Sequence, residues 1–300
     1  MEGKKLNNIE LKTLSEEQRT RLYTSLADVH IQLRRLVFPS IGRLHVASAS
    51  DGGVHVGKKT ASIDLNTQQL EGVAPLDIVD SYMDRSGGTL RSANDYTTML
   101  LEIADNAFAK GRGIVKNEEH AQDRLYHLHM FREYAQGWAD PDLNDGPFVL
   151  VHGDLELFNL ILDNEMNIIS VLDWEWSRVV PVQFFSPPLW LNSTRFESLC
   201  YSFQYRRYLE CSLDEFLDDL RARERERYGE ELLADEWEKR KQDSGFLVAS
   251  ALEGWTGMDW FANRYINFEV YGGKEDVKER VTKSPRLGCV RGRAERTGSG

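Results

Sequence analysis

The sequence predicts a mainly helical α+β fold with a small antiparallel hairpin at its centre. Long segments carry apolar residues at helical spacing, whereas short apolar, β-rich runs separated by polar turns cluster between residues 147 and 172. With 300 residues and 41% hydrophobic content, the chain can bury a large core. Its length allows one or two domains, and we expect one compact lobe.

The first predicted helix begins at a capping box and ends at a proline. Ser15-Glu16-Glu17-Gln18 has the N-terminal signature, apolar residues then recur at helical spacing, and Pro39 stops the run. The next stretch alternates, so Leu44–Ala47 and Val54–Val56 predict a surface hairpin joined across residues 50–53.

Further helices are predicted on both sides of the central hairpin, which places most of the chain in helices. They cover Ser92–Ala109, Asn117–Gln136, Phe196–Arg227 with interruptions, Glu230–Gln242 and Phe246–Phe268.

The central runs bring polar residues together. Pro147–Val151 predicts a buried strand that leads into a loop with His152 and Asp154. Leu160–Leu162 and Ile168–Leu172 predict two strands joined by a polar turn. A hairpin of this kind would bring the residues that flank it, Asn159 and Asp173, beside each other.

These residues occur in the order that kinase-type phosphoryl transfer uses. A carboxylate must accept the proton of an attacking hydroxyl, and Mg²⁺ prefers oxygen ligands. Asp154 would be the catalytic base, and Asn159 and Asp173 would be the metal ligands. The simpler alternative is that Asp154 is a turn or cap residue and that Asn159 only closes a loop. Three matched positions beside a hairpin favour the phosphotransfer interpretation.

The same residues carry a resemblance to a known family. His152-Gly153-Asp154, Asn159 and the run Leu172-Asp173-Trp174-Glu175 resemble the catalytic segment of the aminoglycoside phosphotransferase and choline kinase group, which has a protein-kinase-like fold. Protein kinases have Phe-Gly after the metal-binding Asp, so Trp174-Glu175 resembles the small-molecule group instead.

The flanking segments are similar to the fungal-type branch of that family, and the resemblance extends to about residue 270. The segments that carry it are Glu2–Leu6, Leu33–Leu44 and Gln183–Leu191.

The resemblance implies a protein-kinase-like C-terminal lobe that uses ATP and Mg²⁺ to phosphorylate a hydroxyl of a small molecule. It implies that Ile161 and Leu172 form the floor of the adenine site. It also implies that His152 orients the catalytic loop rather than transferring protons.

Four residues near the motif are candidate contacts for a cationic, amine-bearing substrate through charge or cation–π interaction. They are Glu156, Glu175, Trp174 and Trp176. Core packing is the alternative role for the two tryptophans, and plain solvent exposure is the alternative for Glu156.

Family members carry an N-terminal lobe with a glycine-containing phosphate loop and a strand lysine, and Glu2–Leu6 resembles the hinge that follows that lobe. Gly87-Gly88 and Gly111–Gly113 lack the strand and helix of a phosphate cradle, so turns or helix ends are favoured. We therefore expect impaired ATP binding and activity. The alternative is a catalytically inactive, pseudokinase-like binding protein or a truncated gene product.

The expected organisation is a hinge-like linker over residues 1–12, the kinase-like lobe over 13–280 and a disordered basic tail over 281–300. The run 221–227 mixes charge signs at helical spacing and predicts an exposed helix face that pairs within itself. His127 and His129 face different sides of a helix, which favours structural roles over a shared metal site.

The formal net charge of −11 argues against nucleic-acid binding, because phosphate backbones favour basic surfaces. The three cysteines are widely spaced without a Cys-x-x-Cys pair, which fits a reducing compartment. With neither a leader nor a long apolar run, we expect a cytoplasmic protein without a membrane span. The oligomeric state cannot be read from the sequence.

Overall fold

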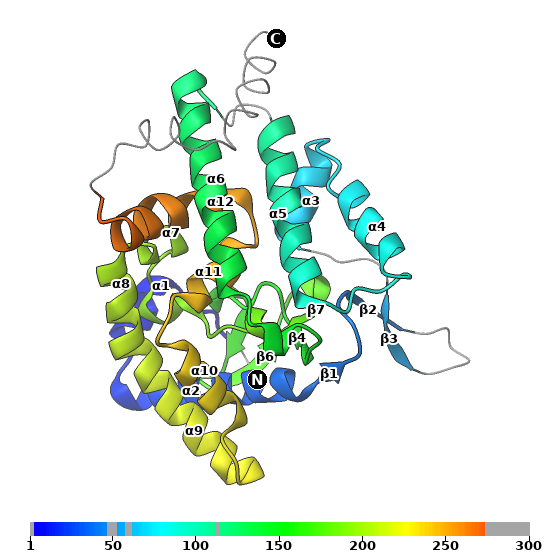
Figure 1. Cartoon of the computed structure of the whole chain (residues 1–300). Helices are drawn as coiled ribbons and strands as arrows, with labels where there is room; N and C mark the ends of the chain where they lie inside the picture. The colour runs from blue at the N-terminus through cyan, green and yellow to red at the C-terminus, as the bar shows by residue number, and fades with distance from the viewer. Residues whose placement is uncertain (1–2, 47–52, 58–61, 112–114, 274–300) are drawn as a thin grey trace.

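The computed structural model describes residues 3–46, 53–57, 62–111 and 115–273, and helices predominate in it (Figure 1). This confirms the predicted mainly helical α+β class. The α-helices are α1 Asn8–Thr13, α2 Glu16–Arg35, α3 Ile63–Leu70, α4 Leu76–Arg85, α5 Ala93–Lys110, α6 Glu118–Trp138, α7 Phe196–Leu199, α8 Ser202–Arg207, α9 Asp214–Tyr228, α10 Leu232–Arg240, α11 Gly245–Ala251 and α12 Trp255–Phe261.

Within the described residues, seven short strands form three small antiparallel sheets. One sheet has the order β1-β4-β7, and the other two are the hairpins β2-β3 and β5-β6. The strands are β1 Val37–Phe38, β2 Arg43–Val46, β3 Val54–Gly57, β4 Phe148–Val151, β5 Leu160–Leu162, β6 Ile168–Val171 and β7 Arg178–Pro181.

The strand predicted before His152 is present as β4, the central strand of its sheet. Val149 pairs with Val180 and Leu150 with Val179, and these side chains are buried. The partner strand β7 was not predicted, because only two valines lie between Arg178 and Pro181, too short a run to identify.

The predicted hairpins also form, as β2-β3 and β5-β6. Register is regular in the first, where His45 lies opposite His55, and shifts once in the second, between Ile161 and Leu162. Part of the β2-β3 connection lies outside the described residues.

Side-chain caps begin three long helices where the sequence predicts them. Ser15 accepts a hydrogen bond from the backbone of Gln18, whose side chain returns one to Ser15, so the capping box is confirmed. Ser92 caps α5 and Asn117 caps α6 in the same position. The buried side of α2 then packs against α9 and β4, which fixes the central sheet on this helix (Figure 1).

Three helices had no counterpart in the predicted elements. Asn7 caps α1, so the segment 1–12, expected as a linker, contains most of a helix. The short helices α3 and α4 fill part of the interval between residues 57 and 92, where no element was predicted. α4 packs on α5, which places both at one side of the fold (Figure 1).

The helix expected over Phe246–Phe268 is interrupted, which corrects the prediction. α11 ends at Ala251, and Gly254 is extended with φ −173° before α12 begins. A Cβ on Gly254 would lie 2.9 Å from Oδ1 of Asp64, so the chain passes close to α3 at this break. Glu253 lies in this break and lines the same cavity as His152.

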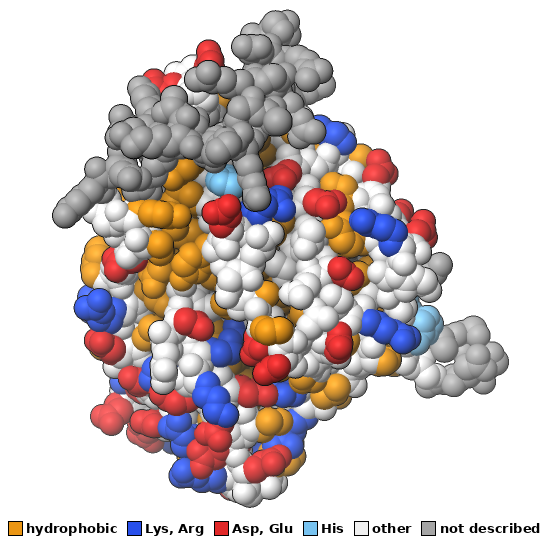
Figure 2. Space-filling view, viewed as in Figure 1, with side chains coloured by type: hydrophobic (Ala, Val, Ile, Leu, Met, Phe, Trp, Pro, Cys, Tyr) orange, Lys and Arg blue, Asp and Glu red, His pale blue; other side chains and the backbone are white. Residues whose placement is uncertain are grey.

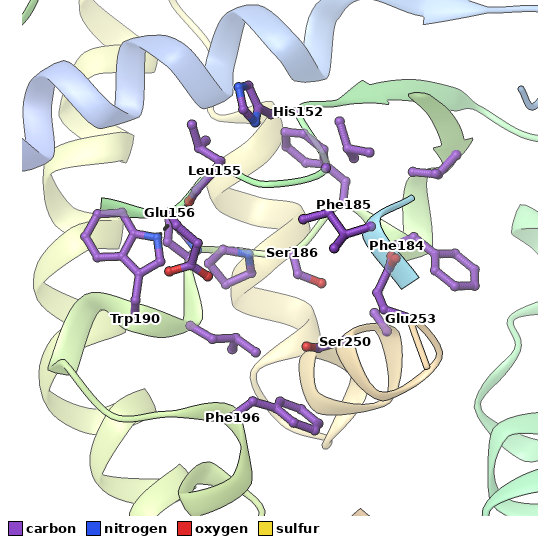
Figure 3. A pocket seen from close by; sticks show the side chains of 18 of the residues that line it. His152, Leu155, Glu156, Phe184, Phe185, Ser186, Trp190, Phe196, Ser250 and Glu253 are labelled. Atoms are coloured by element: carbon purple, nitrogen blue, oxygen red, sulfur yellow. Dashed lines mark hydrogen bonds between the residues drawn. The ribbon is translucent and has the colours of Figure 1, made fainter. Parts of the chain in front are cut away.

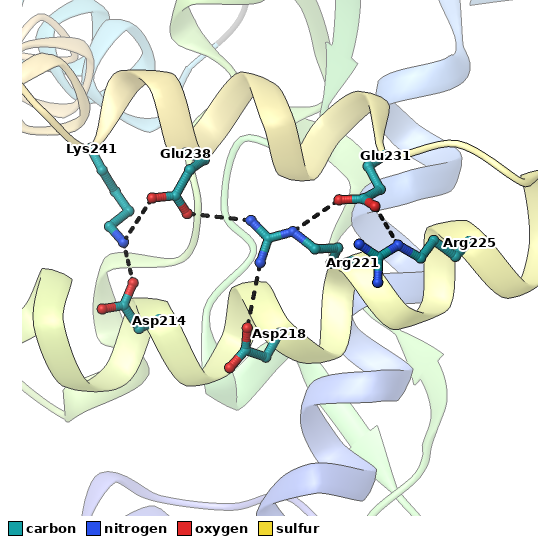
Figure 4. Close-up of polar contacts among 7 residues, drawn as sticks. All are labelled: Asp214, Asp218, Arg221, Arg225, Glu231, Glu238 and Lys241. Carbon is teal, nitrogen blue, oxygen red and sulfur yellow. Dashed lines mark hydrogen bonds and ion pairs between the residues drawn. The ribbon is translucent and has the colours of Figure 1, made fainter.

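The charged run 221–227 pairs mainly with other helices, which corrects the expectation of a self-paired face. Arg223 and Arg227 both reach Asp28 of α2. Arg221 pairs with Glu231 and Glu238, which joins α9 to α10 (Figure 4). Figure 2 shows charged side chains gathered over the region of α9 and α10. Each exposed pair stabilises the fold by only about 0–1 kcal/mol.

Two further observations concern the described residues alone. None of their helices combines the length and the apolar composition needed to cross a membrane. Cys200 and Cys211 are free thiols there, the first buried and the second exposed. Cys289 and the expected basic tail over 281–300 lie outside the described residues.

Candidate active site

His152 ties the loop after β4 to the end of β6. Burial lowers the pKa of His152, so the imidazole is neutral near pH 7. Its Nε2 lies 2.7 Å from the carbonyl oxygen of Leu172 and donates to it. Nδ1 then accepts the backbone N–H of Asp154 at 3.3 Å. The imidazole of His152 thereby links Asp154, before the β5-β6 hairpin, to Leu172, directly after it.

Gly153 lets this loop approach the start of β7. Its φ is +83°, a conformation that side chains with a Cβ rarely adopt. A Cβ there would lie 2.2 Å from the carbonyl oxygen of Trp176 and 2.8 Å from Nη1 of Arg178. Both the backbone conformation and the close approach therefore require glycine.

Asn159 holds Asp154 in place from inside the fold. It lies at the end of a short 3-10 helix, Leu157–Asn159, and is only 1% exposed. Its Nδ2 donates to the carbonyl oxygen of Asp154 at 2.8 Å and to Oδ2 of Asp154 at 2.9 Å. The backbone N–H of Leu172 donates to the carbonyl oxygen of Asn159 at 2.8 Å. The structure thus brings the segments of all three motif residues together.

The side-chain oxygen atoms of Asn159 and Asp173 are of the kind that a hard cation binds. Oδ1 of Asn159 is buried and has no hydrogen-bond partner among the described residues. Asp173 is exposed and left-handed at φ 60° and ψ 47°, and it begins the 3-10 helix Trp174–Trp176. The negative charges of Asp154 and Asp173 both act on His152, so the two carboxylates lie near it. Amide and carboxylate oxygens are the ligands that Mg²⁺ accepts.

These two oxygen donors would be a partial ligand set. Among the described residues, no group of three or more His, Cys, Asp or Glu side chains converges as a metal site. Mg²⁺ in nucleotide sites is ordinarily bound by one or two protein groups, with phosphates and water completing the octahedron. Asn159 and Asp173 fit that pattern.

A cavity of about 720 Å³ opens beside the His152–Glu156 loop (Figure 3). Glu156 and Trp190 lie on one side of it, and Ser250 and Glu253 lie on another, at the end of α11 (Figure 3). The indole N–H of Trp190 donates to the carbonyl oxygen of Leu155 at 2.8 Å, which holds the loop against this wall. The cavity is large enough for a small molecule.

Two carboxyl groups in this cavity have raised pKa values. Desolvation by the surrounding protein, with the charge of Asp154 added, raises the pKa of Glu156 to about 7. Desolvation raises the pKa of Asp64 to about 6, although its hydrogen bond from Gln68 opposes the change. A positively charged group in the cavity would favour the ionised form of both.

Arg178 and Glu253 form an ion pair beside the loop that contains Gly153. Arg178 is buried, and the side chain of Glu253 is 43% exposed. Burial alone would lower the pKa of Arg178, but Glu253 and Tyr96 outweigh it and raise the pKa. Arg178 also donates to the carbonyl oxygen of Trp176 at 3.4 Å. The pair therefore supports the segment that Gly153 touches.

Sequence reasoning missed Arg178, Glu253 and Asp64. A cation at the first position of a short strand was the only signal for Arg178. Glu253 and Asp64 had no local signal, because their places in the cavity come from packing between α3 and the break after α11.

Ile161, one of the two residues expected at the adenine floor, lies beneath the first described residues. Lys4 exchanges two backbone hydrogen bonds of 2.8 Å with Leu162. A Cβ on Gly3 would lie 2.2 Å from Cγ2 of Ile161. Ile161 and Leu172 are both half-buried. The segment that resembles a hinge thus covers β5.

The four candidate substrate contacts separate into two groups. Glu156 lines the cavity, whereas the side chains of Trp174, Glu175 and Trp176 do not. The Trp174 ring packs edge-on against His152 at 4.6 Å between centroids, and its indole N–H donates to the carbonyl oxygen of Val171. Glu175 is exposed.

The two helical histidines have separate environments. His127 is buried, and its Nδ1 lies 2.8 Å from Oδ1 of Asp259, while His129 pairs with Glu133. They share no ligand position.

Comparison with known proteins bears on the whole site. Residues 1–184 match the family model described as the phosphotransferase enzyme family (APH), and this span includes every motif residue from His152 to Asp173. The chain matched no curated protein and no solved structure. The matched span covers more than half of the 300 residues, so the chain belongs to the phosphotransferase enzyme family.

Proposed function

We propose that this chain transfers a phosphoryl group from Mg²⁺-bound ATP to a hydroxyl group of a small molecule. One observation carries the proposal. Asn159 donates its amide N–H to Asp154, and its buried Oδ1 has no hydrogen-bond partner in the described part of the chain, so one side chain would position a base and offer a metal ligand. Family membership supports the reaction class.

Asp154 would act as the base. Its Oδ2 accepts from Asn159, so the second carboxylate oxygen stays available to accept the proton of the attacking hydroxyl. Oδ1 of Asn159 and the carboxylate of Asp173 would hold Mg²⁺, which neutralises charge on the phosphates when bound. His152 would orient both segments and transfer no proton, since both of its ring nitrogens are engaged.

The nucleotide and the acceptor would approach from different sides. Ile161 and Leu172 would lie under the adenine ring, next to the segment that contains Gly3. The acceptor would enter the cavity beside the His152–Glu156 loop, where Gly153 and Leu155 line the wall. Asp154 lies between these two residues in the chain and is not itself a lining residue, so the acceptor hydroxyl would have to reach past them to the carboxylate. Glu156 would attract a positively charged group on the acceptor, with Trp174, Glu175 and Trp176 as further contacts outside the cavity.

We also place the chain in the fungal-type branch of the family. The segment 183–191, one of the three that resemble that branch, supplies much of the cavity wall, including Phe184 and Trp190. Branch-specific residues would therefore shape the acceptor site.

The direct test is transfer of labelled γ-phosphate from ATP to a panel of amino alcohols and polyols in the presence of Mg²⁺. We expect Asp154→Asn to lower turnover by about 1,000-fold or more. Asn164→Ala, in the turn between β5 and β6, is the matched control and should leave turnover unchanged. Retained turnover in Asp154→Asn would refute the assignment of the base.

The same panel of compounds also tests the alternative, a binding protein without catalysis. Calorimetry would detect binding of an acceptor whether or not phosphate is transferred. Binding without transfer in the intact chain would replace the proposed function with the binding role.

A further inference from the structure

A second cavity, of about 500 Å³, adjoins the first. α1, α2 and the segment 204–215 line it, and Ser193 and Thr194 line both cavities. A molecule that extends beyond the first cavity past these two residues would therefore meet the second.

The charge of the second cavity is positive. Its charged lining residues are Lys12, Arg19, Arg207 and Glu215. Arg19 forms an ion pair with Glu215, so these two charges offset each other. Within the described part of the chain, Lys12 and Arg207 form no ion pair, and both are exposed. Two exposed cations that are not paired with a carboxylate of the described residues thus line the cavity.

The charge of the first cavity is of the opposite sign. Three carboxyl groups line it, those of Asp64, Glu156 and Glu253, against the guanidinium groups of Arg178 and Arg195. Arg178 is already paired with Glu253. Among the described residues that line this cavity, Arg195, which is exposed, is therefore the one cation left to oppose Asp64 and Glu156.

The wall between the cavities contains a buried polar atom. Ser193 is left-handed at φ 56° and ψ 28°, and its Oγ is buried without a hydrogen-bond partner among the described residues. A buried hydroxyl without a partner is unfavourable, so a rotation of this side chain towards either cavity would let a ligand satisfy it.

We propose that the acceptor is an elongated molecule with a cationic group near its reactive hydroxyl and an anionic group, carboxylate or phosphate, bound between Lys12 and Arg207. The inference deepens the proposed function and rests on it for the identity of the first cavity as the acceptor site. Opposite charges in adjoining cavities would also fix the orientation of the acceptor.

The test uses direct binding to the full chain without nucleotide. The probes are ω-amino carboxylates and aminoalkyl phosphates of increasing spacer length, each compared with an alkyl amine of equal length. At the spacer length that spans both cavities, we expect a bifunctional probe to bind about tenfold tighter than its amine. The two series show which anionic group is preferred.

Variants separate the two ends of the ligand. Lys12→Ala combined with Arg207→Ala should remove the advantage of the bifunctional probe and leave the affinity for the plain amine unchanged. Glu156→Gln should weaken both probes. Lys5→Ala combined with Arg206→Ala removes two exposed cations outside the cavity and is the control that should change neither affinity.

The outcomes distinguish this inference from the proposed function. Equal affinity for amines and bifunctional probes at every length, or an unchanged advantage in the Lys12 and Arg207 variant, would overturn the inference. Tight binding of a bifunctional probe, with no phosphate transfer to its hydroxylated counterpart, would support the ligand class and refute the proposed reaction.

Discussion

The side-chain amide of Asn159 donates two hydrogen bonds to Asp154, at 2.8 Å to its carbonyl oxygen and at 2.9 Å to Oδ2. The two residues are five positions apart, and Asn159 is buried while Asp154 is half-buried. Asn159 therefore holds the carboxylate of the proposed base, while His152 holds its backbone N–H.

Replacing Asn159 should destabilise the fold as well as the site. Asn159→Ala removes both hydrogen bonds. The carbonyl oxygen of Asp154 keeps the backbone N–H of Glu156 at 2.9 Å, whereas Oδ2 loses its donor, so we expect a cost of about 1–3 kcal/mol of unfolding free energy. Chemical denaturation measures this, with Asn164→Ala, an exposed turn residue, as the control. A loss in Asn159→Ala no larger than in the control would contradict the importance of these hydrogen bonds.

Two glycines with similar φ angles allow the cost of backbone strain to be measured apart from the cost of a steric clash. Gly153 has φ +83° and Gly72 has φ +77°, but a Cβ on Gly72 would meet nothing within 4 Å. We expect Gly72→Ala to lower the unfolding free energy by about 1 kcal/mol. Gly153→Ala should cost about 3 kcal/mol or more, because the new Cβ also meets Trp176. Thermal or urea unfolding of both variants gives the comparison, and equal losses would mean that the loop can move aside.

The raised pKa of Glu156 predicts a pH-dependent penalty. The carboxyl titrates at 4.5 in the unfolded chain and at about 7 in the fold, so the folded state binds this proton more tightly. Its stabilising contribution is complete below pH 4.5 and is lost as the pH rises through 7. Glu156→Gln should therefore gain stability relative to the natural chain over this window.

We expect the gain to reach about 1 kcal/mol at pH 8, since water in the open cavity screens the charge. Unfolding curves collected between pH 4 and pH 8 measure it. Glu175→Gln, at an exposed carboxylate outside the cavity, is the control. A difference that stays constant with pH would show that the Glu156 carboxyl is not perturbed.

The ion pair of Arg178 and Glu253 should respond asymmetrically to mutation. Glu253→Ala leaves a buried guanidinium without its counter-charge and should cost about 3–5 kcal/mol. Arg178→Met keeps most of the packing and leaves a carboxylate that water can reach, so we expect a loss of about 1–2 kcal/mol.

The double variant tests the reason for this asymmetry. Arg178→Met with Glu253→Ala removes both charges, and it should unfold less easily than Glu253→Ala alone. Denaturation of all four proteins in a double-mutant cycle measures the coupling. Strictly additive losses would show that the two residues act independently.

Local sequence patterns predicted the elements that have local causes. The capping residues Ser15, Ser92 and Asn117 mark helix starts by their own side-chain hydrogen bonds, so their positions could be read directly. β7 and the break at Gly254 were not predictable, because a short strand and a helix interruption depend on what packs against them.

The sequence by itself determined the order of the chemical groups: a histidine and a glycine before Asp154, Asn159 five positions later, and Asp173 at the end of a hairpin. That order is local because a single strand, loop and hairpin contain it. Only the tertiary structure decided what surrounds these groups. Glu253 meets Arg178 across 75 positions, and Glu156 shares its cavity with the 184–190 segment and α11. Burial and charge pairing depend on which distant segments pack together, and no spacing along the chain records that.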